Sequence, residues 1–449
     1  MECCKKDYQD RSDCARSDRP AETWPKMTFA HVFYYCIAIL SLLNFARVLT
    51  MLIGADMYDI REMKKAHFNQ AKRAHTPLIS IIVPAYNEET GVIRTVESLL
   101  ATTYKNKQII VVDDGSEDKT YARLRQFQRK HPGKITVVRQ VNAGKAMAIN
   151  RAVQYHAKGS LVMVVDADSL LHPQAVTNMV GHFRDRRIIA SAANVKIIPT
   201  RAWLGVAQRF EYLISYRMKR ALTTMNMEYI VGGVGSTFRK KALLKTGLYD
   251  TDTMTEDIDL TVKLIREYGN QKFRIHYAAD ALAYTEHVLT FRALIKQRFR
   301  WKYGRMQTLL KNQMLFFNRA KKYDKRLTFY QLPYAIIGEF VLLLEPLLVG
   351  YILVVAAMYA DATSLISVYL IVTAFVLLMV SGETTETWRT KAQLVYALPF
   401  VYFMMYVLTA VEFAALMKSL SKRRELLRRE MHRASWDHVE RSSKRVRIA

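Results

Sequence analysis

LVMVVDAD, residues 161–168, is the stretch that decides the fold, because an unbroken apolar run leads directly into two aspartates. A run that is apolar at every position suits a strand covered on both faces, as in a parallel sheet. Asp166 and Asp168 are two residues apart, so at a strand end both side chains point to the same side. The stretch predicts a buried parallel strand that ends in a pair of carboxylates.

Three similar runs come before it in the chain, with helical patterns between them. They are ISIIVP with its core at 80–84, QIIVVDD at 108–114 and ITVVRQ at 135–140. Strands that alternate with helices are typical of a doubly wound α/β sheet. Ligands of such sheets bind beyond the carboxyl ends of the strands, so the polar residues after each run are the candidate site.

Polar residues follow all four runs. They are PAYNEE at 84–89, DDGS at 113–116, NAGK at 142–145 and DAD at 166–168. A single carboxylate of this kind is commonly a helix cap or a turn residue. Four polar strand ends on one edge instead indicate a nucleoside diphosphate site, with carboxylates for the ribose and base and a lysine for phosphate. The Asp-x-Asp pair suits a hard divalent cation, Mg²⁺ or Mn²⁺.

Two common nucleotide motifs are missing from the sequence. There is no Walker-type Gly-x-x-x-x-Gly-Lys-Ser/Thr, and no Gly-x-Gly-x-x-Gly opens the first helix of the α/β region. This argues against a P-loop hydrolase and a dinucleotide oxidoreductase. The four cysteines, Cys3, Cys4, Cys14 and Cys36, all lie in the first tenth of the chain without metal-type spacing, which excludes thiol and zinc-thiolate chemistry.

Apolar residues gather towards both ends of the chain. Residues 29–46 carry no formal charge, which predicts a membrane-spanning helix. Three apolar stretches follow the α/β region, at 329–360, 363–381 and 394–417. Two prolines and two glutamates interrupt the first of these, so we expect an interfacial helix that leads into a span.

Lys and Arg flank these stretches and predict the topology. Basic residues directly after the first span place the α/β domain in the cytoplasm, and the basic C-terminal tail belongs there too. If the α/β domain and the tail both lie in the cytoplasm, the chain between them must cross the membrane an even number of times. Three apolar stretches are present there, so the number of crossings stays open. The segments that we expect are an N-terminal segment 1–28, a transmembrane helix 29–54, a basic linker 55–75, a cytoplasmic domain 76–290, interfacial helices 291–345, a transmembrane region 346–417 and a basic cytoplasmic tail 418–449.

The chain is strongly basic, with 67 Lys and Arg against 40 Asp and Glu, a net charge of +27. Such an excess indicates a polyanionic neighbour. Juxtamembrane Lys and Arg are attracted to anionic lipid by about 1 kcal/mol each, which accounts for much of the excess. No aromatic and basic platform of the RNA-binding kind occurs, so we expect membrane lipid and no nucleic acid as a partner.

Two further motifs follow the four strand ends, TED at 255–257 and QRFRW at 297–301. The ordered set PAYNE, DDGS, NAGK, DAD, TED and QRFRW, over about residues 78–305, resembles the processive membrane glycosyltransferases of family 2. This group contains the cellulose, chitin, hyaluronan and poly-N-acetylglucosamine synthases. Its bacterial poly-β-1,6-N-acetylglucosamine members are the most similar in length and in the context of QRFRW.

The resemblance implies a GT-A-type, Rossmann-like nucleotide-sugar domain inserted between transmembrane helices in the plasma (inner) membrane. The implied activity is inverting transfer of a sugar, expected to be N-acetylglucosamine, from a UDP-sugar to a growing β-linked polysaccharide, processively and coupled to translocation. A small membrane subunit is a further expected partner. The implied roles are donor binding by Tyr86, Glu88, Asp113, Asp114, Lys145 and Asp166, metal binding by Asp166 and Asp168, catalysis by Asp257 as general base beside Glu256, and contact with the acceptor or diphosphate by Gly233, Gln297, Arg300 and Trp301.

Structural alternatives exist for several of these residues. Asp257 opens a helical pattern, where an acid is favoured by the helix dipole, and both roles are compatible. QRFRW also fits an ordinary amphipathic helix on a membrane face. WDHVER at 436–441 faintly resembles a gating segment of the family. Glu345 and Glu412, inside apolar stretches, are expected to face a polar path.

Two other functions remain open at this point. One is a non-processive membrane transferase with a lipid-linked acceptor, against which QRFRW speaks. The other is an inactive transporter or scaffold with a sugar-binding domain, against which the intact Asp166, Asp168 and Asp257 speak. The identity of the sugar, its linkage and the product length are not encoded in any motif that we can interpret.

Overall fold

The computed structural model describes residues 29–69, 76–359 and 362–428. The chain divides into two units, residues 1–51 and 52–449. Helix α1 (Phe29–Asn69) begins in the first unit and continues as helix through most of the expected basic linker. Four parts of the sequence analysis lie outside the described residues: segment 1–28 with its three cysteines, the linker end 70–75, the tail beyond residue 428, and WDHVER at 436–441.

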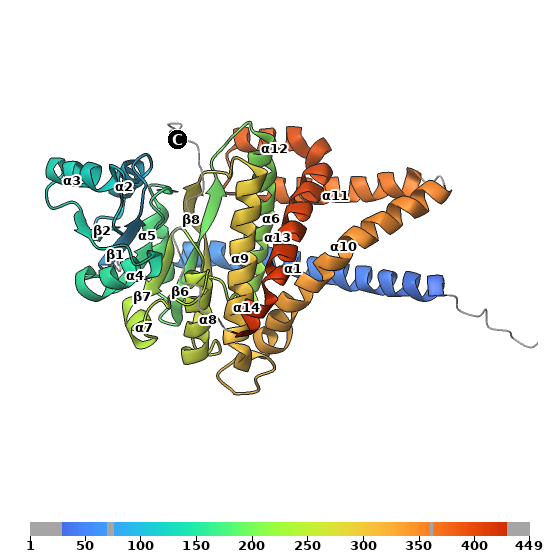
Figure 1. Ribbon diagram of the computed structural model, residues 1–449, viewed down its shortest axis with the longest axis horizontal. Coiled ribbons are helices and arrows are strands. Elements are labelled where there is room, and N and C mark those ends of the chain that lie inside the picture. The colour runs from blue at the N-terminus through green and yellow to red at the C-terminus, as the bar shows by residue number, and fades with distance from the viewer. Residues whose placement is uncertain (1–28, 70–75, 360–361, 429–449) are drawn as a thin grey trace, which may run out of the picture. The chain divides into compact units, whose positions relative to one another are not determined.

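A mixed sheet of eight strands forms the centre of the second unit (Figure 1), within the described residues. Its spatial order is β3-β2-β1-β4-β7-β6-β8-β5. The strands are β1 (Ile79–Ala85), β2 (Lys107–Asp113), β3 (Thr136–Arg139), β4 (Leu161–Val164), β5 (Leu170–Leu171), β6 (Ile188–Ile197), β7 (Ser236–Arg239) and β8 (Arg274–Thr285). The four strands expected from the sequence are confirmed as β1 to β4, and their pairs are parallel.

The sheet is covered on both faces, as its continuous apolar runs predict. Alternate residues of β1 enter different cores: Ile81 and Val83 belong to one cluster and Ile82 to the other. Every residue of β1 is buried. The doubly wound arrangement follows from this, because a strand with two apolar faces needs a helical layer on each side.

Helices connect and cover the strands. In the α/β domain they are α2 (Val92–Leu100), α3 (Thr120–Lys130), α4 (Lys145–Arg151), η1 (Ala152–His156), α5 (Ala175–His182), α6 (Trp203–Thr224), α7 (Lys240–Lys245) and α8 (Glu256–Tyr268). After β8 come α9 (Phe291–Lys311), η2 (Gln313–Leu315), η3 (Arg326–Gln331), α10 (Leu332–Tyr359), α11 (Ala362–Gly382), α12 (Trp388–Ala397), η4 (Leu398–Phe400), α13 (Val401–Ser421) and α14 (Arg423–Arg428).

Helix α10 continues through Pro346 as one helix. The expectation of an interfacial helix that leads into a span at 329–360 stays a prediction. Apolar helices tolerate a proline where neighbouring groups satisfy the freed carbonyl. Among the described residues two helical segments, 326–347 and 388–421, are long and apolar enough to cross a membrane, and 369–382 is a shorter apolar helix.

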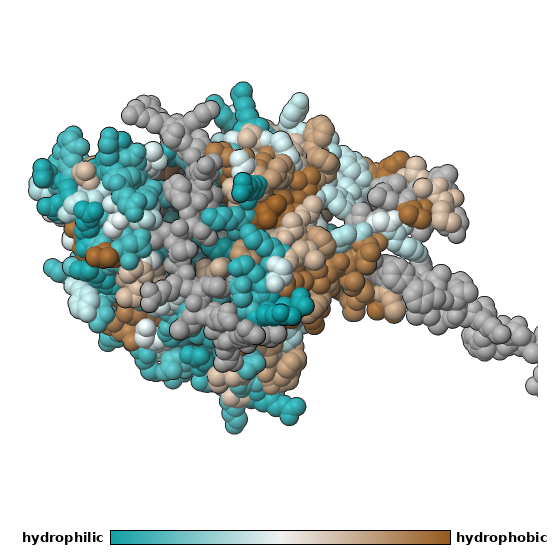
Figure 2. All heavy atoms as spheres, in the orientation of Figure 1, coloured by the Kyte–Doolittle hydropathy of each residue, from teal (hydrophilic) through white to brown (hydrophobic). Residues whose placement is uncertain are grey.

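Three helices form a layer beside the sheet. Helices α6, α9 and α13 lie side by side (Figure 1) and share a core that includes Phe210, Leu294 and Val401. Figure 2 shows hydrophobic side chains gathering over α10 and α13, whereas α2 and α3 carry mostly hydrophilic ones. On the face shown, the described residues of the second unit are therefore more polar over α2 and α3 than over α10 and α13.

Candidate active site

A cavity of about 620 Å³ lies beyond the carboxyl ends of β1 and β4. Residues from α6, α8 and α9 line it as well, so it lies between the sheet and the helical layer. It contains most of the residues expected from the sequence. These are Tyr86, Glu88, Lys145, Asp166, Asp168, Gly233, Glu256, Asp257, Gln297, Arg300 and Trp301.

The register of the sheet explains why distant motifs meet here. In the parallel pair β1 and β4, Ile79 lies opposite Leu161 and Ile82 opposite Val164. The residues after both strands therefore reach the same edge of the sheet, as the carboxyl ends of parallel strands do. This brings PAYNE and DAD into one cavity.

The loops after β1 and β2 are fastened to each other. The backbone N–H of Asn87 donates to Ser116 Oγ at 3.0 Å, and the N–H of Glu117 donates to Asn87 Oδ1 at 2.9 Å. Asn87 adopts a left-handed conformation with φ of 53°, which Asn tolerates better than most residues. The turn after Asn87 thus holds Glu88 at the cavity.

Asp113 and Asp114 are expected donor ligands that do not line the cavity. Asp114 Oδ1 accepts from the Ala143 N–H at 3.0 Å and Oδ2 from the Gly144 N–H at 2.8 Å, so it shapes the loop that precedes Lys145. The fully buried Asp113 lies 3.2 Å from Arg139 Nε. Burial raises its pKa, against the opposing effects of Ser116 and Arg139.

Lys145, the first residue of α4, connects two acidic motifs. Its Nζ lies 2.8 Å from Asp166 Oδ1 and 3.3 Å from Glu256 Oε1. Burial by itself would lower the pKa of this lysine, but Asp166, Glu256 and Asp257 outweigh burial and raise it. Lys145 is therefore a permanent positive charge in the middle of the cavity.

Asp257 is held by two backbone groups at the start of α8. Its Oδ2 accepts from the Gly233 N–H and its Oδ1 from the Ile258 N–H, both at 2.8 Å. Burial and the neighbouring Glu256 raise its pKa, against the opposing effects of Lys145 and the two N–H groups. The carboxylate is thus fixed in direction and more basic than an exposed aspartate.

The glycines at 232–233 allow this contact. A Cβ added to Gly232 would lie 3.0 Å from Asp257 Oδ2, and Gly233 has a φ of +68°, which side-chain-bearing residues rarely adopt. The Gly-Gly turn therefore lets the backbone approach the carboxylate closely.

Asp166 and Asp168 are the candidate metal ligands. Both carboxylates line the cavity, and Ser169 Oγ donates to Asp168 Oδ1 at 2.8 Å. A donor set made only of carboxylate oxygens fits a hard divalent cation rather than a soft one. The residues present therefore fit Mg²⁺ or Mn²⁺.

Helix α9 presents QRFRW to the opposite side of the cavity. Gln297, Arg300 and Trp301 are three and four residues apart, so they share one helical face. The guanidinium of Arg298 lies 4.3 Å from the centre of the Trp301 ring. The other α9 residues here belong to an ion-pair network.

The sequence analysis named Glu412 but did not predict this ion-pair network. Arg298 lies 2.6 Å from Glu211 and 3.2 Å from Glu412, and Lys302 lies 2.9 Å from Glu339 and 2.7 Å from Glu412. The expectation that Glu412 faces a polar environment is confirmed, because it lines the cavity; Glu345 does not line it. The signal in the sequence was the occurrence of acids within apolar stretches.

Helix α6 also supplies cavity residues that no motif marked. Tyr212, Ser215, Tyr216 and Lys219 all line the cavity from this helix. Their spacing of three and four residues fits one helical face, but ordinary amphipathic helices have the same spacing. A sequence pattern of that kind cannot distinguish a cavity wall from a packed surface.

Comparison with protein-family models matches residues 75–304, just over half of the chain, to "Glycosyltransferase like family 2". The chain belongs to this family. Its resemblance to family 2, inferred from the six motifs, is confirmed.

Curated relatives of this family 2 chain include two poly-β-1,6-N-acetyl-D-glucosamine synthases. The one from Staphylococcus epidermidis is 32% identical over 62% of this chain and 66% of its own length. The one from Staphylococcus aureus (strain COL) is 34% identical over 56% of this chain and 59% of its own length. The chain thus spans less than two thirds of the length of these relatives.

Among solved structures, a mannosyltransferase from Pyrobaculum calidifontis in complex with GDP-Man and Mn²⁺ is similar in fold. The TM-score is 0.51 at 20% identity, and the match covers 84% of this chain and 98% of that one. The likeness supports a GT-A-like, Rossmann-like fold for this family 2 member, as expected from its motifs.

Proposed function

We propose that this family 2 chain is a membrane-embedded inverting glycosyltransferase that transfers a sugar from a UDP-sugar to a growing β-linked polysaccharide. The observation that carries the proposal is Asp257, a buried carboxylate fixed by two N–H groups in the cavity that also contains Lys145 and the Asp-x-Asp pair. The relatives named as poly-N-acetylglucosamine synthases favour N-acetylglucosamine as the sugar.

Asp257 is the proposed general base. A sugar hydroxyl is a poor nucleophile, and a carboxylate within hydrogen-bond reach takes its proton while the oxygen attacks the anomeric carbon. The raised pKa of Asp257 suits this role, because a base works best when its pKa lies near the operating pH. In-line displacement inverts the anomeric centre, so an α-linked donor gives a β-linked product.

The donor end of the cavity is proposed to hold UDP. Tyr86, Glu88, Asp113 and Asp114 belong to the loops expected at the nucleoside, and Lys145 provides positive charge next to Asp166. Asp166 and Asp168 would hold Mg²⁺ or Mn²⁺, which when bound stabilises negative charge on a leaving diphosphate. Arg300 is the proposed second cation for that diphosphate.

The acceptor end is proposed to lie along α9. Trp301 offers a flat apolar face for a sugar ring, and Gln297 offers hydrogen bonds. The ion-pair network of Arg298 and Lys302 with Glu412 supplies a polar wall that continues towards the apolar helices. A polar wall in that position supports the processive form, in which the product passes through the membrane region.

The proposed location is the plasma membrane with the α/β domain in the cytoplasm. Two helical segments among the described residues after the domain are long and apolar enough to cross a membrane, which is compatible with the even number of crossings that a cytoplasmic basic tail would require. Anionic lipid is the proposed neighbour of the basic flanks, and a small membrane subunit stays a prediction.

The test is to purify the protein in nanodiscs with Mg²⁺ or Mn²⁺ and follow UDP release with each common UDP-sugar while sizing the product. We expect a long polymer from UDP-N-acetylglucosamine. One sugar added to a lipid would favour the non-processive alternative, and no release from any donor would favour the inactive scaffold or a missing partner subunit.

A further inference from the structure

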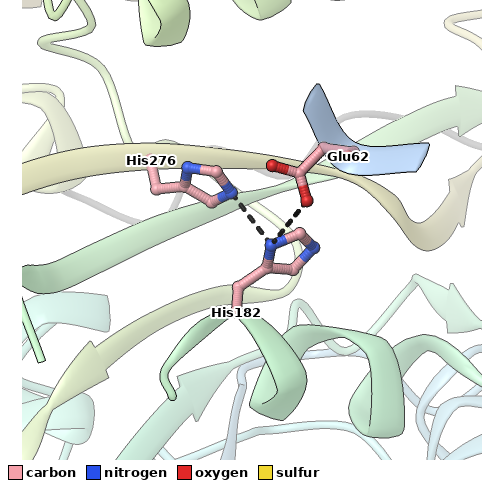
Figure 3. A group of neighbouring side chains, drawn as sticks. All are labelled: Glu62, His182 and His276. Carbon is pink, nitrogen blue, oxygen red and sulfur yellow. Dashed lines mark hydrogen bonds and ion pairs between the residues drawn. The ribbon is translucent and has the colours of Figure 1, made fainter. Parts of the chain in front are cut away.

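A second group of metal-ligand side chains lies outside the cavity, on the side of the α/β domain. Glu62 from α1, His182 from the end of α5 and His276 from β8 point their ligand atoms at one another (Figure 3). All of these atoms lie within 4.8 Å of one another. Thr285 and Glu286, at the other end of β8, line the active-site cavity, so the three-residue cluster is a separate feature.

The fold brings α1 to this position through Tyr58. Its hydroxyl donates to the carbonyl of Tyr277 at 2.7 Å and accepts from the N–H of Ala279 at 3.3 Å, and the residue is buried. Glu62 is four residues after Tyr58, so it lies on the same helical face one turn further on. Docking of Tyr58 on β8 therefore carries Glu62 towards His276.

An irregularity in β8 places a fourth residue beside the cluster. The pairing with β6 shifts between Ala278 and Leu282, and Asn194 Nδ2 donates to the carbonyl of Ala279 at 2.8 Å within the shifted part. Such bulges redirect side chains. Here Asp280 reaches His182, with Oδ1 at 2.7 Å from Nε2.

This contact orients His182. A carboxylate accepts hydrogen bonds, so Nε2 donates to Asp280 and Nδ1 faces the other two members of the cluster. Nδ1 lies 3.1 Å from His276 Nε2 and 3.7 Å from Glu62 Oε2. Metal-binding histidines almost always have such an outer carboxylate or carbonyl partner, because it orients the ring and raises its basicity.

The separations are close to those of a coordination shell. Ligands about 2.0–2.2 Å from a tetrahedral ion lie about 3.3–3.6 Å from one another. His182 Nδ1 lies 3.1 Å from His276 Nε2 and 3.7 Å from Glu62 Oε2, so shifts of a few tenths of an ångström would reach that range. A bound cation would replace the hydrogen bond between the two histidines, and the proton on His276 Nε2 would pass to Nδ1 of the same ring or to solvent.

The donor set indicates the class of metal. Two imidazoles and one carboxylate suit a borderline ion such as Zn²⁺, whereas a hard ion such as Mg²⁺ prefers oxygen ligands. His276 is buried and the Glu62 side chain is 24% exposed, which leaves an approach for the ion and for a water in the fourth position.

We propose that Glu62, His182 and His276 form a zinc-type site that fastens α1 to α5 and β8, with Asp280 as the outer partner of His182. The site joins three segments that are far apart in the sequence. Its occupancy stabilises the docking of α1 residues 52–62 on the domain. This inference does not depend on the proposed sugar transfer.

The test measures zinc binding to the full chain in detergent after bound metal has been removed with a chelator. The chain carries Asp166→Asn and Asp168→Asn, which remove the candidate metal ligands of the active site. Zn²⁺ is titrated in competition with a chromogenic chelator. We expect one tight equivalent, at least tenfold weaker binding in Glu62→Gln and in Asp280→Asn, and loss of the equivalent in His182→Ala. His172→Ala, a half-buried histidine outside the cluster, is the matched control and should bind as the background does.

Two further measurements guard against a folding defect in the variants. Added zinc should raise the Tm of the background chain. It should change the Tm of the Glu62→Gln variant very little, because Gln preserves the size and shape of the side chain but is a much weaker metal ligand. Zinc X-ray absorption should give two imidazoles in the coordination shell. No tight equivalent in the folded background chain, or the same equivalent in folded His182→Ala, would overturn the proposal and leave a hydrogen-bonded histidine pair.

Discussion

At the scale of single residues, the direction and basicity of Asp257 carry the chemical argument. The carboxylate sits in the first turn of α8, so the helix-terminus interpretation and the catalytic one are both compatible with its place. What distinguishes it from an ordinary helix-terminal acid is burial beside Glu256 and the contact with Gly233.

Asp257→Asn should abolish transfer and retain donor binding. The amide keeps the shape but cannot accept the proton, which typically costs about 10²–10⁴-fold in rate. UDP release and UDP affinity are measured on the same preparation. Asp185→Asn, which breaks a surface pair with Arg187, is the matched control and should behave as wild type. Equal turnover in Asp257→Asn would reject the assignment.

Activity should fall as the pH is lowered, since the base must be ionised. Burial and Glu256 raise the pKa of Asp257, so the loss should begin at a higher pH than for an ordinary aspartate, about 3.9. The check is kcat/KM against pH at saturating Mg²⁺ or Mn²⁺. A profile that stays flat down to the ordinary aspartate range contradicts the role of Asp257.

Gly232→Ala should lower kcat at least tenfold. Its Cβ would lie 3.0 Å from Asp257 Oδ2 and displace the carboxylate from its two N–H donors. Gly181→Ala is the matched control, because a Cβ there meets nothing within 4 Å. If both variants keep wild-type kcat at similar Tm, the close approach at Gly232 has no catalytic importance.

At the scale of elements, some residues of the strand-end loops position other cavity residues instead of lining the cavity themselves. Asp114 illustrates this, because it belongs to the expected donor motif and yet binds the backbone of the loop before α4. Asp114 therefore contributes to the site by positioning Lys145. The motif alone does not show this role, because it depends on how two loops pack.

Asp114→Ala should raise KM for the donor more than it lowers kcat. Two backbone N–H groups lose their acceptor, and each buried group left without one costs about 1–3 kcal/mol of stability. The loop that positions Lys145 is therefore held less firmly. Steady-state kinetics and Tm are the measurements. Asp114→Asn keeps one acceptor oxygen and should be intermediate; a variant with unchanged KM and Tm would contradict the positioning role.

At the scale of the whole molecule, charged residues join segments far apart in the sequence. Arg220 of α6 is buried and binds Asp59 of α1 at 2.9 Å and Glu383 after α11 at 2.7 Å. The opposing charge of Arg220 keeps the pKa of Glu383 low although burial would raise it. The Arg220 guanidinium is therefore one of the groups that join α1 and α6 to the segment after α11.

Arg220→Leu should destabilise the fold by about 3–5 kcal/mol, because a buried carboxylate loses its partner. Adding Glu383→Leu should recover much of the loss, since the unpaired charge is removed with it. Denaturant unfolding of the full chain in detergent measures both. Equal stability of Arg220→Leu and wild type would show that the buried pair contributes nothing.

The sequence by itself determined the local and periodic features of this protein. Continuous apolar runs identified β1 to β4 and their parallel pairing, and most of the residues expected from the motifs lie in the cavity. These predictions succeeded because strand burial and helix faces follow from the spacing of residues along the chain, which is visible in one dimension.

Only the tertiary structure decided which residues from distant segments meet. Three features depend on packing between segments. They are the ion-pair network of Arg298 and Lys302 with Glu211 and Glu412, the hydrogen bonds of Asp114 to the loop before α4, and the cluster of Glu62, His182 and His276. The continuous course of α10 through Pro346 belongs here too. No periodic pattern encodes such contacts, because they arise from the free energy of packing separate elements together rather than from the preferences of any one element.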